Sequence, residues 1–246
     1  MAETWDPSER WYHRCVGEKG HYYHQSLVIP NALRLLGHFS SLLDLGCGQG
    51  VLARHLPKGV DYVGIDASKA LIQKAQKMTP GQKFFAADAS LPLPLEKKTF
   101  DRVSFILSLQ NMEKGKEAIF IAASHLARGG KMLFVLNHPC FRIPRQSSWG
   151  IDEKKKLQYR RIESYKTAQK IPIQTAPSQK EKSATTYSYH HPLSEIVLWL
   201  QNGKLVIENL EEWYSDKKSE GPKSKMEDRA RGEIPLFLCL IARKEE

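Results

Sequence analysis

The sequence has few cysteines and no long apolar run. Its four cysteines, Cys15, Cys47, Cys140 and Cys239, lie far apart and form no C-x-x-C pair. This spacing argues against a zinc site or a disulfide framework and suits a reducing compartment. No apolar stretch approaches the roughly 20 residues of a membrane-spanning helix, and the polar first ten residues lack the apolar core of a secretory signal. We therefore expect a soluble, cytoplasmic protein without a metal.

Positive charge is in excess. The 246 residues include 37 Lys and Arg against 27 Asp and Glu, which gives a formal net charge of +10. Such a charge is compatible with nucleic acid, an anionic membrane surface or acidic substrates, but it does not indicate a fold. A general bias toward lysine explains it equally well. The length is sufficient for one sizeable core, as in a single α/β domain.

A glycine-rich stretch after an apolar run is the most informative part of the sequence. Residues 41–45 predict a strand, and Gly46, Gly48 and Gly50 then alternate with other residues. Glycines at such a turn let the backbone approach a ligand closely. The dinucleotide-binding fingerprint requires glycine at the first, third and sixth positions, but the sixth position counted from Gly46 is Val51. A nicotinamide oxidoreductase is therefore disfavoured.

Strand and helix patterns alternate along the first half of the chain. We expect strands at 41–45, 60–66, 83–87, 100–107 and 131–136, and helices at 49–56, 69–78 and 117–126, the last ended by Gly129 and Gly130. This alternation predicts a doubly wound parallel sheet with its ligand at the carboxyl ends of the strands. A helix near 191–200 and strands at 204–210 and 234–242 follow, and residues 214–231 are expected to be charged and exposed.

Acidic residues follow the first strands. Asp66 ends the second expected strand, where a carboxylate can accept hydrogen bonds from both hydroxyls of a ribose. Asp44 precedes the first glycine, and Asp88 follows the third strand. Because the carboxyl ends of parallel strands lie at one edge of the sheet, the acids and glycines are expected to meet there.

The order Asp44, Gly46, Gly48, Gly50 resembles motif I of the class I S-adenosylmethionine (SAM) methyltransferases, especially the small-molecule, type 11-like group. The Asp88-Ala89 pair is similar to motif II of that family. The resemblance implies a Rossmann-like, doubly wound seven-stranded sheet, mostly parallel with an antiparallel last strand and with helices on both faces. It also implies SAM as cofactor, S-adenosylhomocysteine as product, and a set of cofactor-binding residues: Asp44, Gly46, Cys47, Gly48, Gly50, Asp66, Ala67, Asp88, Ala89 and Leu107.

The same resemblance implies one methyltransferase domain over residues 1–246. Within it we expect an N-terminal helical cover (1–39), a SAM-binding core (40–137), an insertion or lid (138–190) and a C-terminal helix and hairpin (191–246). The long polar stretch at 145–189 is a lid, an acceptor-binding insertion or a partly disordered loop. Its basic runs are interleaved with aromatics; such a mixture can stack on bases or cover a flat ring, although a solvated face is more usual.

Methyl transfer requires a nucleophile held in line with the sulfonium methyl group, and a base if the acceptor is a hydroxyl or an acidic carbon. Histidine suits this role because its pKa is near neutrality. The first candidate is His138, at the end of the fifth strand, followed by His21 and His24, with His190 and His191 behind them; each has a structural role as its alternative. Cys140 is more typical of a pocket residue than of a nucleophile, and Gln110 and Asn111 either orient a substrate or cap the next helix.

The acceptor is left open by the sequence. A small molecule is favoured. An RNA or protein acceptor is the alternative, because of the basic charge and the basic-aromatic insertion, and a non-catalytic SAM-binding protein is a third possibility.

Overall fold

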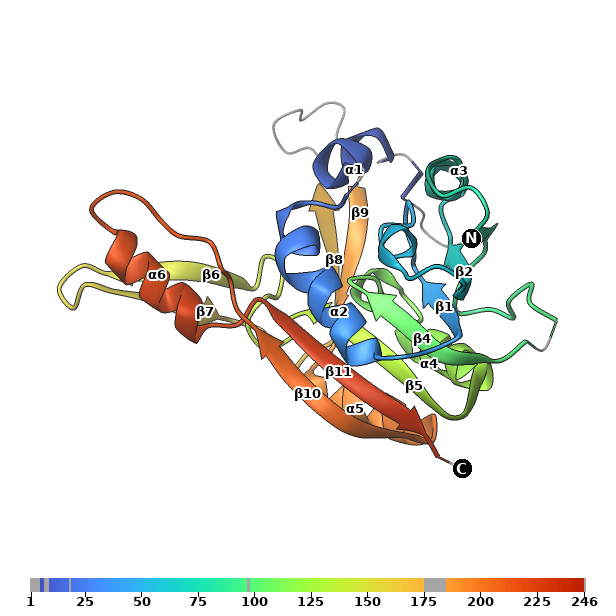
Figure 1. Cartoon of the computed structure of the whole chain (residues 1–246). Coiled ribbons are helices and arrows are strands. Elements are labelled where there is room, and N and C mark those ends of the chain that lie inside the picture. Colours follow the sequence, from blue (N-terminus) through green and yellow to red (C-terminus); the bar gives the residue numbers. More distant parts are fainter. Residues whose placement is uncertain (1–4, 7–8, 18, 97, 175–184, 246) are drawn as a thin grey trace.

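The computed structural model describes residues 5–6, 9–17, 19–96, 98–174 and 185–245. A seven-stranded sheet in the order β3-β2-β1-β4-β5-β11-β10 forms its centre (Figure 1). The strands are β1 Ser41–Leu45, β2 Asp61–Asp66, β3 Lys83–Ala86, β4 Phe100–Ile106, β5 Leu126–Asn137, β10 Leu205–Trp213 and β11 Phe237–Lys244. The strands from β3 to β5 pair in parallel, whereas β11 runs antiparallel to both β5 and β10. The predicted fold class is confirmed.

Helices cover both faces of the sheet (Figure 1). Helices α2 (Ile29–Leu36) and α3 (Lys69–Met78) lie on one face, and α4 (Gly115–Ser124) and α5 (Leu193–Asn202) on the other. Alternate side chains of β5 point to opposite faces: Leu133 packs with the core beneath α2, and Phe134 packs with the core beneath α4 and α5. Burial on both faces explains the continuous apolar runs at residues 132–136 of β5 and 237–242 of β11.

Two sequence predictions in the core were wrong. The helix expected at 49–56 is a turn followed by a short 3₁₀ helix, Ala53–His55. Gly50, at a φ of +74°, lies outside the helical region, and Pro57 follows, so only a single 3₁₀ turn forms between them. The expected stop at Gly129 and Gly130 is also misplaced, because α4 ends at Ser124 and both glycines lie inside β5.

Residues 138–190 form two hairpins. Strands β6 (Ser147–Asp152) and β7 (Leu157–Ile162) pair antiparallel, as do β8 (Gln169–Gln174) and β9 (Thr185–His190); residues 175–184 lie outside the described ranges. The β6–β7 hairpin and helix α6 (Ser224–Glu233) together project from the body, and we call this unit the arm (Figure 1). Helix α6 was not predicted, because its sequence is almost wholly polar and charged and has no apolar stripe.

The β8–β9 hairpin stands beside the body, near the N-terminal helix α1 (Glu9–Val16) (Figure 1). None of the described helices combines the length and apolar character that a membrane span requires. Within the described ranges, no cluster of three or more His, Cys, Asp or Glu side chains is placed to hold a metal ion.

Candidate functional site

The glycine turn after β1 depends on backbone conformations that favour glycine. Gly46, Gly48 and Gly50 have φ values of +73°, +56° and +74°. A Cβ atom on Gly46 would lie 2.3 Å from the Cβ atom of Ser108, which the backbone of the neighbouring strand end holds in place. The amide N–H groups of Gly46 and Cys47 both donate to the carbonyl of Ile65 on β2. The turn is thereby fixed against the end of the adjacent strand.

Asp66, at the end of β2, is held by the same turn. Its Oδ2 accepts a hydrogen bond from the N–H of Gly48 at 2.9 Å, and its Oδ1 accepts one from the N–H of Ser68 at 2.9 Å. Burial raises the pKa of this carboxyl group, and the two backbone hydrogen bonds oppose the rise. The carboxylate is oriented before any ligand binds, and its remaining lone pairs stay available.

A cavity of about 470 Å³ lies at these strand ends, within the size range of small-molecule sites. Its floor comes from the glycine turn, Asp66 and the residues that follow β4. The opposite side comes from α1 and the β8–β9 hairpin, which contribute Trp11, Tyr12, Ile173 and Thr186. Among the described lining residues, Asp66 is the only one with a formal charge at neutral pH.

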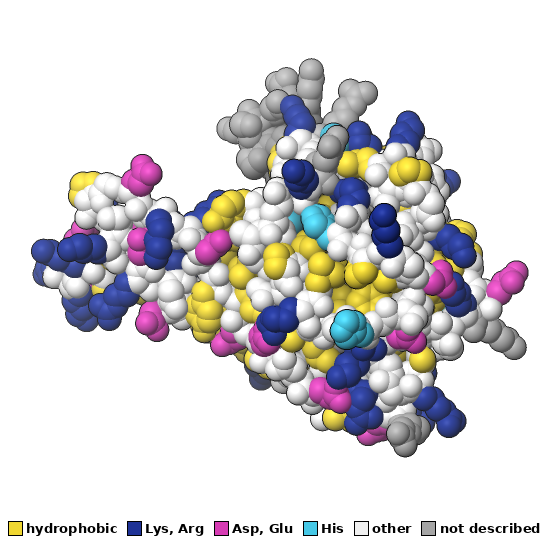
Figure 2. All heavy atoms as spheres, in the orientation of Figure 1, with side chains coloured by type: hydrophobic (Ala, Val, Ile, Leu, Met, Phe, Trp, Pro, Cys, Tyr) yellow, Lys and Arg dark blue, Asp and Glu magenta, His cyan; other side chains and the backbone are white. Residues whose placement is uncertain are grey.

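Figure 2 shows the same contrast on one face of the molecule: Lys and Arg side chains gather at the end of the arm, and the middle of the body shows mainly hydrophobic and uncharged groups. The net charge of the chain therefore belongs largely to surfaces away from the cavity.

Seven of the sequence-predicted site residues line the cavity: Gly46, Gly48, Asp66, Ala67, Leu107, His21 and His24. Leu107 has a φ of +54°, a conformation that is uncommon for a residue with a side chain. Its carbonyl accepts hydrogen bonds from the side-chain amides of Gln110 and Asn111, at 3.0 and 3.2 Å. Both amides line the cavity and neither caps α4, whose N-cap residue is Lys114.

Other predicted cofactor residues do not line the cavity. The carboxylate of Asp44 is buried beneath the turn and accepts hydrogen bonds from the hydroxyls of Ser104 (2.7 Å) and Tyr62 (2.9 Å). Burial raises the pKa of Asp44 to about 6. Cys47 and Gly50 pack inside the turn, Asp88 accepts hydrogen bonds from the backbone and hydroxyl of Ser90, and Ala89 is part of the core.

His138 also lies outside the cavity lining, and its side chain is only 2% exposed. The ring nitrogen Nδ1 accepts the N–H of Cys140 at 3.2 Å, so Nε2 carries the proton and donates to Glu212 Oε1 at 2.8 Å. Burial lowers the pKa of this imidazole, and Glu212 opposes the shift. With both nitrogens bonded to protein groups, the geometry favours the structural alternative for this residue.

His21 and His24 face the cavity as a pair, with ring centroids 4.1 Å apart. His21 Nδ1 accepts the N–H of Tyr23, so its proton lies on Nε2. Burial, with the nearby Lys217, lowers the pKa of His21, and burial lowers the pKa of His24 to about 3. Both imidazoles are therefore neutral at physiological pH.

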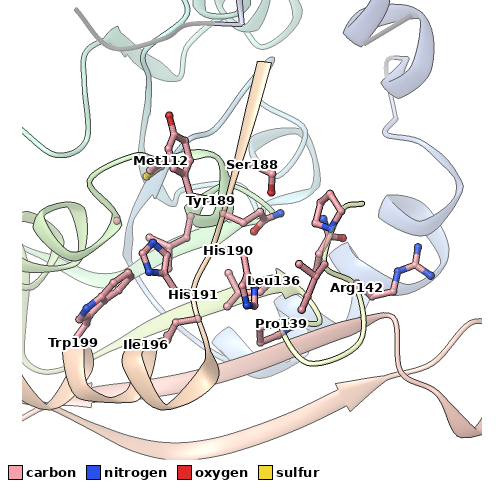
Figure 3. Close-up of a pocket in the computed structure, with 16 residues that line it drawn as sticks. Met112, Leu136, Pro139, Arg142, Ser188, Tyr189, His190, His191, Ile196 and Trp199 are labelled. Atoms are coloured by element: carbon pink, nitrogen blue, oxygen red, sulfur yellow. The ribbon is translucent and has the colours of Figure 1, made fainter. Parts of the chain in front are cut away.

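A smaller cavity of about 40 Å³ adjoins the first (Figure 3), and five residues line both: Gln110, Met112, Asn137, Pro144 and Ser188. His190 Nε2 donates to the carbonyl of Tyr165 at 2.6 Å, and His191 Nδ1 lies 3.1 Å from Glu195. His191 packs edge-on against Trp199, as Figure 3 shows, and the guanidinium of Arg142 points away from this group. These two histidines are bonded within the protein.

Sequence reasoning missed several residues that shape the site. Gln49, inside the glycine turn, is fully buried: its Nε2 donates to the carbonyl of Gly17 at 2.5 Å, and its Oε1 accepts from His13 Nδ1 at 2.9 Å. The side chain thus ties the N-terminal segment to the turn. The only sequence signal for this role was a polar residue within an otherwise glycine-rich turn. No sequence signal indicated that Tyr12 and Thr186 line the cavity.

Residues 43–134 match the sequence model of a family described as "Methyltransferase domain". No curated protein matches the chain at a significant level. Among solved structures, an S-adenosylmethionine-dependent methyltransferase from Mesorhizobium loti is 24% identical, with 89% of this chain and 99% of that chain covered and a TM-score of 0.68. One from Clostridium acetobutylicum is 18% identical, with 98% and 99% covered and a TM-score of 0.60.

A glycopeptide N-methyltransferase solved with SAM is also similar, at 16% identity, with 87% of this chain and 91% of that chain covered and a TM-score of 0.57. These three likenesses concern the fold. The matched family segment runs from β1 into β5 and includes the glycine turn and Asp66, the features around which the larger cavity is built. Over residues 43–134 the chain therefore matches the methyltransferase-domain family, and its fold is the one found in solved SAM-dependent methyltransferases.

Proposed function

We propose that the protein transfers the methyl group of SAM to a small-molecule acceptor enclosed in the larger cavity. The observation that carries this proposal is the Asp66 carboxylate, held by two backbone N–H groups beside a neutral cavity of about 470 Å³. When bound, SAM supplies a methyl group that its sulfonium makes electrophilic. The chain's own task is to hold the cofactor and acceptor in line and to exclude water.

The residues present suit this cofactor. Asp66 can accept hydrogen bonds from two ribose hydroxyls, and Gly46 and Gly48, which have no side chains of their own, line the cavity with backbone atoms. Ala67 and Leu107 complete the proposed contact surface. Asp44, Cys47 and Gly50 support the turn from behind, and the role of Asp88 and Ala89 in holding the adenine stays a prediction.

The acceptor would lie between the N-terminal cover (1–39) and the insertion (138–190), because both contribute lining residues opposite the glycine turn. The enclosure by α1 and the β8–β9 hairpin favours a molecule of limited size. An RNA acceptor is the second candidate, since exposed Lys154, Lys155 and Lys156 lie at the tip of the β6–β7 hairpin. Methyl-labelled SAM added with a cell extract separates these alternatives by the fraction, small molecules or RNA, that gains label.

Titration calorimetry with SAM tests the cofactor site. Asp66→Ala removes two charge-assisted hydrogen bonds, each worth about 1.5 kcal/mol or more, and is expected to weaken SAM binding roughly 100-fold. Asp61→Ala is the matched control, because Asp61 lies at the other end of β2 and pairs with Lys98 outside the cavity. Affinity within threefold of wild type in Asp66→Ala would overturn the proposed cofactor site.

A further inference from the structure

Two arginines lie together where the arm joins the body. Arg142 follows β5, and Arg160 lies on β7. Arg160 Nε donates to the carbonyl of Phe141 at 2.7 Å, and one of its terminal nitrogens donates to the hydroxyl of Ser147 at 2.7 Å. These hydrogen bonds hold the Arg160 guanidinium against the segment that carries Arg142.

The Arg160 guanidinium is oriented by a third contact. Its central carbon lies 5.3 Å from the ring centroid of Trp149, the cross-strand neighbour of Arg160 in the hairpin, which is a cation–π distance. The second terminal nitrogen forms no hydrogen bond with a described residue. Because the planar group is held before any ligand binds, little side-chain entropy is lost when a ligand does.

The Arg142 guanidinium is less constrained. It forms no hydrogen bond or ion pair with any residue in the described ranges, although the side chain is half-buried. In Figure 3 it points away from the smaller cavity. The unpaired nitrogens of both arginines keep some solvent-accessible surface, so a bound molecule can reach them.

The two positive charges oppose each other without a counter-charge. Burial and the charge of Arg142 lower the pKa of Arg160 to about 10, and burial lowers the pKa of Arg142. No described Asp or Glu forms an ion pair with either group. Partly buried like charges are disfavoured unless an opposite charge joins them. A carboxylate or phosphate would be that charge, and its geometry matches the guanidinium fork.

This pair of arginines lies beside the larger cavity. Tyr23, which acts on the charge of Arg142, packs edge-on against His21 and Phe237, with ring centroids 6.3 and 5.9 Å apart. His21 and Phe237 line the larger cavity, and so does Pro144, two residues beyond Arg142. Arg142 is thus separated from the cavity lining by one side chain.

We propose that Arg142 and Arg160 form an anion-binding site, which holds a carboxylate or phosphate group of the acceptor while the acceptor's reacting group lies in the larger cavity. This rests on the proposed methyltransferase function. The described lining of the larger cavity contains no cation, so an anionic group of the acceptor would bind outside that lining. The site selects and orients the acceptor and takes no part in the transfer of the methyl group.

Inorganic phosphate and acetate are probes of the site in the protein alone. Either anion, compared with chloride at equal ionic strength, should raise the thermal midpoint of the wild type. Arg142→Gln breaks no hydrogen bond within the described structure and relieves the repulsion, so its midpoint without these anions should be unchanged or higher. The rise that the anions cause should be lost. Arg128→Gln, at an exposed arginine at the other end of β5, should keep it.

Equal rises in the wild type and in Arg142→Gln would show that the anion binds elsewhere and would overturn the site. A wild-type midpoint that neither phosphate nor acetate moves would overturn it as well.

The acceptor is sought in the small-molecule fraction of a cell extract, sorted by ion exchange into anionic, cationic and uncharged pools. Each pool is incubated with the protein and methyl-labelled SAM, and label in the anionic pool is the expected result. Label only in another pool overturns this inference and leaves the proposed function intact; if phosphate still raises the midpoint, the site binds a free anion only. Absence of label from all three pools, with SAM binding retained, overturns the proposed function itself.

Kinetics with the labelled pool test the role of Arg142. Arg142→Gln should raise KM for the acceptor about tenfold, as for loss of a charge-assisted hydrogen bond, with kcat and SAM affinity within threefold of wild type. Arg128→Gln should change none of the three. An unchanged KM, or a loss confined to kcat, contradicts a binding role. If Arg142→Gln fails to fold, the wild type decides: phosphate should compete with the acceptor and raise its KM without lowering kcat, and absence of competition overturns the inference.

Discussion

The cavity and the arm are built in opposite ways. The cavity is formed by residues from distant parts of the sequence, from Trp5 to Phe237, and its lining is almost uncharged. The arm is formed by one hairpin and one short helix, and it carries a concentration of Lys and Arg (Figure 2). The net charge of +10 therefore describes surfaces outside the cavity lining. Net charge is a poor guide to what this site binds.

The largest difference is expected from one substitution made in each region. Gly46→Ala should lower the free energy of unfolding by about 3 kcal/mol, because a positive φ and a 2.3 Å contact with the Ser108 Cβ act together. Gly221, in the segment that leads into helix α6 of the arm, has a φ of +85° but nothing within 4 Å of an added Cβ atom, so about 1 kcal/mol is expected for Gly221→Ala. Urea unfolding measures both; equal losses would show that the turn is not tightly packed.

An intermediate effect is expected from the acid beneath the glycine turn. The folded-state pKa of Asp44 is raised to about 6, above the value of about 3.9 expected in the unfolded chain. Protonation therefore favours the folded state, and this stabilisation is lost as the pH rises through about 6. Relative to Asp44→Asn, the wild type should gain about 1 kcal/mol in unfolding free energy between pH 7 and pH 5.

Unfolding of both proteins at several pH values measures this difference. Subtracting the unfolding free energy of the variant from that of the wild type cancels the contributions of the titrating groups that the two proteins share. A difference that is constant with pH, or that changes with the opposite sign, would show that the Asp44 carboxyl group ionises freely in the folded protein.

The smallest effect on the cavity is expected from the arm. Replacing Lys154, Lys155 and Lys156 together with Gln should leave SAM affinity unchanged and stability within about 0.5 kcal/mol, as for exposed positions generally. Weak binding to RNA should decline, and its salt dependence should become shallower by about 0.7 for each phosphate that a lysine no longer neutralises. Calorimetry measures the affinity for SAM, and filter binding measures the binding to RNA. A loss of SAM affinity would mean that the arm and the cavity are coupled.

The sequence predicted the sheet well, because buried parallel strands give apolar runs that need little context. It failed where local signals conflicted. Gly129 and Gly130 fit a helix end, yet they lie in β5, where pairing with neighbouring strands decides the structure. Helix α6 lacks an apolar stripe, so its periodicity carried no signal. Segment 49–56 has an apolar pattern, but Gly50 adopts a φ of +74°, which an α-helix does not contain, and Pro57 follows at the other end.

The floor of the site was also predictable, because Gly46, Gly48 and Asp66 occur at fixed distances from the ends of expected strands. The opposite side was not. Thr186 follows the glycine turn by well over a hundred residues, and nothing in its neighbourhood indicates that β9 borders the cavity. For histidine, composition offered several candidates, and only the hydrogen bonds in the structure show that His138 is bonded at both nitrogens.

The Gln49 side chain has a thermodynamic consequence. Because its amide bonds both Gly17 and His13, the glycine turn and the N-terminal segment share one equilibrium between ordered and loosened states. A ligand that stabilises the turn must then also strengthen the docking of residues 9–17. By reciprocity, a molecule that binds residues 9–17 changes the affinity for the ligand by the same factor by which the ligand changes the affinity for that molecule. Binding of a molecule to the exposed side of α1, outside the cavity, would thus change the affinity for the cofactor.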